Sequence, residues 1–74
     1  MSKEYYVLIK NVEGEEFYVS KNAPDEIVED LSVALSFFSL NHISVWSKCN
    51  PNVKDTIVAK VSVVDDYVNV TKIK

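Results

Sequence analysis

The chain has 74 residues, of which 47% are hydrophobic and 26% are charged, and it contains two prolines and one glycine. This composition excludes a multi-domain enzyme and a disordered segment, and it predicts one small folded domain over residues 1–74. Eight lysines, no arginine and eleven acidic residues give a formal net charge of −3, which disfavours broad electrostatic binding to nucleic acid or anionic lipid.

The cysteine count and the N-terminal residues bear on the cellular compartment. One cysteine cannot form an internal disulfide, and the start of the chain runs into alternating apolar residues without the features of a signal peptide. No apolar run approaches the roughly 18 residues that span a bilayer. We therefore expect a cytoplasmic protein that makes no contact with membranes.

A two-residue alternation runs from Glu4 to Lys10 and again from Glu16 to Val19, and it predicts two antiparallel strands. We expect a three-residue loop between them, closed by Asn11 and Glu15, with the only glycine in a left-handed conformation. In this register the face that forms the core carries Tyr5, Val7, Ile9, Phe17 and Val19.

The next segment has the signals of a helix. Asn22, Ala23 and Pro24 suit the cap and the first turn, and the acidic Asp25 and Glu26 suit the positive end of the helix dipole. Apolar residues at helical spacing then predict one amphipathic helix that ends near residue 40, with a core stripe of Ile27, Val28, Leu31, Ala34, Leu35 and Phe38.

The remaining chain has the character of strands. Residues 43–48 alternate and predict a third strand, followed by a loop at residues 49–52. The stretches Thr56 to Val64 and Tyr67 to Ile73 are rich in valine, isoleucine and threonine, and they predict a hairpin with a tight turn at residues 65–66. The order ββαβββ defines an α+β fold, in which a single helix packs on one face of a mainly antiparallel four- to five-stranded sheet.

One helix covers only one face of such a sheet, so the opposite face is expected to expose a contiguous aromatic and aliphatic surface. Such a surface is typical of an interface. We therefore predict a small non-enzymatic protein-binding module, an inhibitor or adaptor, whose partner is another protein or a second copy in a homodimer. The expected partner-binding residues are Tyr6, Leu8, Tyr18, Trp46, Val58 and Tyr67.

Several alternatives to this interpretation remain open. The same face is an ordinary wet face of an antiparallel sheet if no partner covers it. With Lys10, Lys48 and Lys60 it would form a stacking platform for single-stranded nucleic acid. The acidic residues of the expected helix would instead mimic nucleic-acid phosphates. Val33 and Phe37 form a second candidate patch on the helix, unless they tuck against a sheet edge.

Residues with catalytic or metal-binding chemistry are few. His42 and Cys49 are the only imidazole and the only thiol, and no local motif supports a nucleophilic pair or a zinc site. Asp65 and Asp66 suit a turn better than a cation site, and a single glycine cannot form a phosphate-binding loop. We expect no catalytic residues, no cofactor and no metal.

Overall fold

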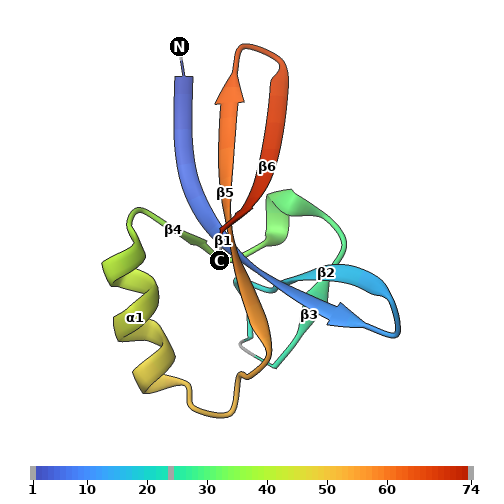
Figure 1. Ribbon diagram of the computed structural model, residues 1–74, viewed down its shortest axis with the longest axis vertical. Helices are drawn as coiled ribbons and strands as arrows, with labels where there is room; N and C mark the ends of the chain where they lie inside the picture. The colour runs from blue at the N-terminus through green and yellow to red at the C-terminus, as the bar shows by residue number, and fades with distance from the viewer. Residues whose placement is uncertain (1, 24, 74) are drawn as a thin grey trace.

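The computed structural model describes residues 2–23 and 25–73, which form one α-helix and a mainly antiparallel six-stranded sheet (Figure 1). This confirms the predicted α+β class. The strand order along the sheet is β3-β2-β1-β5-β6, and β4 pairs with β1 off this path. The elements are β1 (Ser2–Val12), β2 (Glu15–Val19), β3 (Ile27–Val28), the 3-10 turn η1 (Leu31–Val33), β4 (Ser36–Phe37), α1 (Leu40–Cys49), β5 (Thr56–Val64) and β6 (Tyr67–Ile73).

Strand β1 is the centre of the sheet. Its residues 2–10 pair with β5 along one edge, while its other edge is shared by β4 at residues 6–7 and by β2 at residues 9–12. Figure 1 shows β1 and β5 as a long twisted pair that runs through the molecule. Val7, Leu8 and Ile9 are all buried, so both faces of β1 are covered at its middle.

Two hydrophobic clusters lie on the two faces of the sheet. The first consists of Val7, Ile9, Ala34, Ala59 and Val61, with Leu31 of η1 packed against it. The second consists of Leu8, Val19, Phe37 and Ile43, with Trp46 of α1 packed against it. The segment around η1 therefore covers one face and the helix covers the other. This two-sided core differs from the expected arrangement with one covered face.

The first hairpin forms as predicted, but its register is shifted by one residue. Val12 pairs with Glu15, so the loop has two residues, Glu13 and Gly14, with φ angles of 54° and 86°. Two consecutive positive φ angles are characteristic of a type I′ turn, whose twist matches that of the strands. Asn11 Oδ1 accepts a hydrogen bond from the Gly14 N–H at 3.1 Å.

The shifted register changes which side chains of β2 share a face with those of β1. Ile9 lies opposite Tyr18, and Tyr18 packs against the first cluster. Val19 moves to the face of Leu8 and belongs to the second cluster. The predicted core face, which placed Phe17 and Val19 with Ile9, is wrong because the turn is one residue shorter.

The turn provides a stability test. Glu13 is strained in the left-handed region, whereas asparagine is tolerated there and Asn-Gly is the preferred type I′ pair. Glu13→Asn should therefore raise the free energy of unfolding by about 0.5–1 kcal/mol in denaturant titrations. The control is Glu15→Asn, which removes the same charge from a strand residue. If both variants are stabilised equally, the gain comes from the loss of a negative charge, and the left-handed conformation of Glu13 is not its cause.

The predicted helix, which was to begin after a cap at Asn22 or Ala23 and end near residue 40, is wrong. Pro24, assigned to its first turn, lies outside the described residues, and the segment from Ile27 to Phe37 forms β3, η1 and β4. Its backbone groups bond to the end of β2 and to the residues after it. The Leu35 N–H donates to the Val19 carbonyl at 2.9 Å, and the Lys21 N–H donates to the Val33 carbonyl at 3.1 Å. These tertiary hydrogen bonds replace those that a helix would make internally.

Side chains in the same segment favour this irregular path. Asp30 caps η1, because its Oδ1 accepts hydrogen bonds from the Ser32 N–H at 2.9 Å and from the Ser32 hydroxyl at 2.8 Å. These hydrogen bonds, led by the one from the backbone, hold the pKa of Asp30 below its ordinary value of 3.8. Serine and aspartate compete with helical hydrogen bonding in this way, and the branched Ile27 and Val28 suit a strand.

The helix forms where the third strand was predicted, at Leu40–Cys49. Ser39 is its N-cap, and the Ser39 hydroxyl accepts from the His42 N–H at 3.3 Å. Ile43 and Trp46, spaced by three residues, face the second cluster. Asn50 ends the helix and its side-chain amide donates to the Trp46 carbonyl at 2.9 Å. A helix of this length depends on tertiary packing, here through Ile43 and Trp46.

The second hairpin confirms the prediction in bounds and register. Val64 pairs with Tyr67, Val63 with Val68 and Val61 with Val70. Asp65, the first turn residue, has a φ of 55°, which a type II′ turn requires at that position. The length of this turn therefore determines which residues of β5 and β6 pair with each other.

Candidate interaction surface

The structure disperses the predicted binding residues. Tyr6, Trp46 and Val58 are half-buried and pack against the second cluster, while Leu8 is part of it. Helix α1 forms at Leu40–Cys49 instead of in the predicted segment and covers this face, so the expected exposed aromatic surface is largely internal. Tyr18 packs on the opposite face, against the first cluster.

The second predicted patch is also redistributed. Val33 is half-buried in η1, and Phe37 is buried in β4. The ring of Phe37 meets the ring of Trp46 edge to face, with centroids 5.7 Å apart. Phe37 thus connects β4 to α1 inside the core. Of all the residues predicted for partner binding, Tyr67 alone is fully exposed, at 76%.

Tyr67 lies on a three-stranded projection that we call the arm. The arm consists of residues 2–5 of β1, residues 61–64 of β5 and residues 67–70 of β6, held in continuous antiparallel register. Figure 1 shows these strands extending away from the helix and from the first hairpin. Because the arm projects from the rest of the chain, its outer surfaces are available to a partner.

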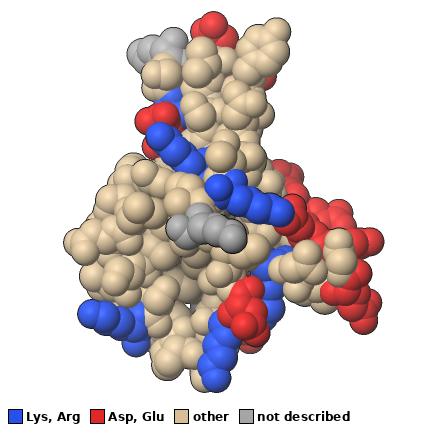
Figure 2. Space-filling view, in the orientation of Figure 1, with Lys and Arg blue, Asp and Glu red and all other residues tan. Residues whose placement is uncertain are grey.

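Large exposed apolar side chains gather on the arm. Half of those in the described chain lie there, namely Val64, Tyr67, Val68 and Val70. Figure 2 shows the upper part of the arm as largely uncharged, with acid at its tip, where Asp65 and Asp66 form the turn. Val64 and Tyr67 lie on one face of the arm and Val68 and Val70 on the other, so apolar side chains are exposed on both sides of β6.

The free edge of β6 lies between these two sets of exposed apolar side chains. Within the described chain, β6 pairs only with β5, so one edge of the strand carries unpaired N–H and C=O groups. Natural proteins usually protect such an edge with prolines, bulges or several charges. Strand β6 contains no proline, its pairing with β5 is uninterrupted over seven residues, and Lys72 is its only charged residue.

An apolar hollow of about 340 Å³ lies at the C-terminal end of β6. Thr56, Ile57 and Val58 of β5 line it together with Lys72 and Ile73 of β6. The exposed Tyr67 ring lies at the opposite end of the same strand. The edge of β6 therefore has a protruding aromatic side chain at one end and a hollow at the other.

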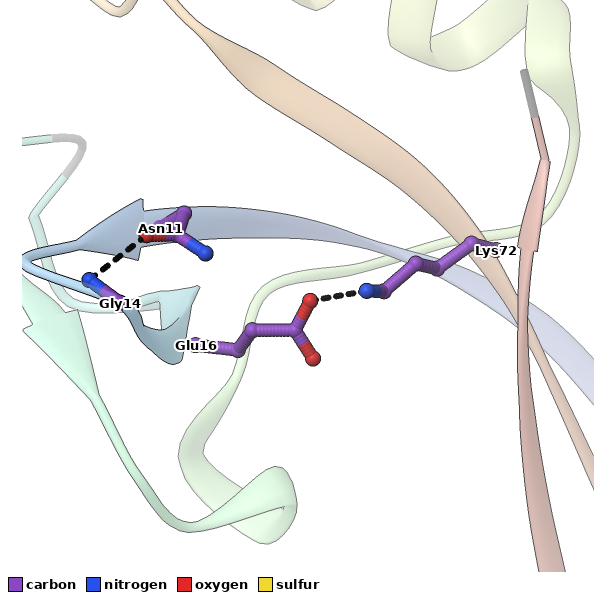
Figure 3. A network of polar contacts seen from close by, with 4 residues as sticks. All are labelled: Asn11, Gly14, Glu16 and Lys72. Atoms are coloured by element: carbon purple, nitrogen blue, oxygen red, sulfur yellow. Dashed lines mark hydrogen bonds and ion pairs between the residues drawn. The ribbon is translucent and has the colours of Figure 1, made fainter.

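Two ion pairs each connect two strands of the sheet, one pair between β5 and β1 and the other between β6 and β2. Lys60 Nζ lies 3.2 Å from Glu4 Oε2, and Lys72 of β6 pairs with Glu16 of β2. Figure 3 shows the side chains of Glu16 and Lys72 pointing toward each other, with the Asn11 and Gly14 turn contact beside them. All four charged groups are largely solvated, so each pair contributes at most about 1 kcal/mol.

The residues with catalytic potential do not converge. His42 and Cys49 are both exposed on α1, and their separation of seven residues corresponds to roughly 10 Å along the helix axis. The imidazole contacts the exposed Phe38 ring. In residues 2–23 and 25–73, no group of three or more His, Cys, Asp or Glu side chains is arranged to hold a metal ion.

Comparison with protein-family models, with curated proteins and with solved structures finds no match. In the part of the chain that the structure describes, no helix has the length and apolar character needed to cross a bilayer.

Proposed function

We propose that the protein is a non-enzymatic protein-binding module that acts as an inhibitor or adaptor and binds its partner through the free edge of β6. The observation that carries this proposal is the combination of an unpaired seven-residue edge with exposed apolar side chains at Tyr67, Val68 and Val70. Edge strands of this kind accept an added strand from a partner, and the backbone hydrogen bonds provide affinity while the alternating side chains provide specificity.

The proposal transfers the predicted binding function from the aromatic face to the arm. Tyr6 of β1 and Trp46 of α1 are half-buried against the second cluster, so they offer little free ring surface for stacking bases. The acidic mimic required one helix to present Asp25, Glu26, Glu29 and Asp30 together, and these four residues lie outside α1. Protein binding through β6 therefore has the better structural support among the three hypotheses.

A peptide with the sequence of Tyr67–Ile73 tests whether this edge accepts a strand. A fluorescently labelled copy should bind the protein saturably in anisotropy titrations, because it offers the alternating side chains of a matching strand. The matched control carries an N-methyl group at the residue that corresponds to Val70, which blocks pairing on one edge. Equal binding of both peptides, or no saturable binding of either, contradicts the proposal.

A further inference from the structure

We infer that the strand added to β6 is the β6 strand of a second copy, paired antiparallel about a two-fold axis at Val70. This inference rests on the proposed function and names the partner of the same edge. In this register Val70 faces the same residue of the second copy, and Tyr67 lies opposite Ile73 of that copy. The whole of β6 then takes part in the pairing.

The backbone geometry selects this register. In the β5–β6 hairpin the residues that flank the two-residue turn form a hydrogen-bonded pair, and bonded and non-bonded pairs then alternate. The N–H and C=O groups of Val68, Val70 and Lys72 therefore point away from β5, toward the free edge. A two-fold axis at Val70 brings these outward groups opposite one another over the full length of the strand.

The side chains are complementary in the same register. Each Tyr67 reaches Ile73 of the second copy, which lines the apolar hollow at the end of β6. An exposed ring thus meets an apolar recess at both ends of the interface. On the same face as Tyr67, Asn69 lies opposite Thr71, so two polar side chains meet.

The charges also favour a second copy. Lys72 lies opposite the uncharged Val68 of the other chain, so the register brings no like charges directly together. Asp66 is the diagonal neighbour of that lysine, at the roughly 7–8 Å spacing that long side chains bridge. The contact is isologous and closes on itself, so it forms a dimer and leaves no second β6 edge for growth of a fibre.

A charge exchange at the two-fold axis tests this inference. Wild-type protein should reach twice the monomer mass with rising concentration in sedimentation experiments. Val70→Lys and Val70→Glu should each weaken self-association by roughly five-fold or more, because like charges lie directly opposite. An equal mixture of the two variants should recover the dimer, because only residue 70 facing itself places lysine opposite glutamate.

The controls separate this inference from the proposed function. Val45→Lys adds the same charge to an exposed position on α1 and should leave the dimer intact, and circular dichroism checks the fold of each variant. A dimer that persists in Val70→Lys, or a mixture that stays monomeric, overturns the inferred register. A monomeric wild type that still binds the Tyr67–Ile73 peptide overturns the second copy alone, whereas a monomer that binds no peptide overturns both proposals.

Discussion

Leu8→Ala is expected to remove most of the stability of the protein. Leu8 is 2% exposed at the centre of the second cluster, where it packs with Val19, Phe37 and Ile43. Truncation of a buried leucine costs about 2–5 kcal/mol, and a domain of this size has only about 3–5 kcal/mol in total. Chemical denaturation should therefore show a variant that is largely unfolded, or close to it, in the absence of denaturant.

The matched control for this prediction is Leu40→Ala. Leu40 is 51% exposed at the start of α1, so its truncation should change the free energy of unfolding by less than about 1 kcal/mol. Similar losses in the two variants would contradict the assignment of Leu8 to a core covered by α1. This comparison also tests the two-sided core, because the one-sided arrangement leaves Leu8 on the solvent face.

Phe37→Ala is expected to have a comparable effect. Phe37 is 6% exposed and its ring packs edge to face against Trp46. Truncation of a buried phenylalanine costs about 3–5 kcal/mol. Because Trp46 is the only tryptophan, its fluorescence reports the loss of this contact, and a red-shifted emission should accompany the lower denaturation midpoint.

The neighbouring residue is the control for this second prediction. Phe38 is 85% exposed, so Phe38→Ala should leave both the midpoint and the emission of Trp46 nearly unchanged. A stable Phe37→Ala variant with unaltered tryptophan emission would contradict the packing of β4 against α1. It would also restore Phe37 to the surface patch that the sequence predicts.

Local turn chemistry explains why the hairpins could be predicted. In the second hairpin the two residues between Val64 and Tyr67 determine the register of every pair, and the structure confirms it. In the first hairpin the glycine signal indicates the correct turn region, but it does not distinguish a two-residue from a three-residue loop. The difference of one residue moves Val19 to the other face of the sheet.

The helix was misplaced because periodicity alone does not separate an amphipathic helix from short irregular strands. Residues 27–38 carry helical spacing, yet their serines and branched side chains disfavour a helix and their backbone groups pair with the end of β2. The signals for the observed helix are also in the sequence. Ser39 is a strong N-cap, apolar Ile43 and Trp46 follow at helical spacing, and Pro51 comes just after the last turn.

The site was only partly predictable, because it depends on which face each element covers. The run Val7, Leu8 and Ile9 signals a strand that is buried on both sides, and this signal removes Leu8 from any exposed surface. Tyr67 was identified from its aromatic character. The predicted binding surface does not include Val68 and Val70, because the pairing of β5 with β6 places them on the opposite face from Tyr67.

Residue-resolved hydrogen exchange of β6 tests the central claim most directly. At low protein concentration the amides of Asn69 and Thr71, which face β5, should exchange slowly, while those of Val68 and Val70 should exchange rapidly. At high concentration, or with the Tyr67–Ile73 peptide in excess, the amides of Val68 and Val70 should also become protected. Rapid exchange of these two amides under all three conditions would contradict the use of the β6 edge as a binding surface.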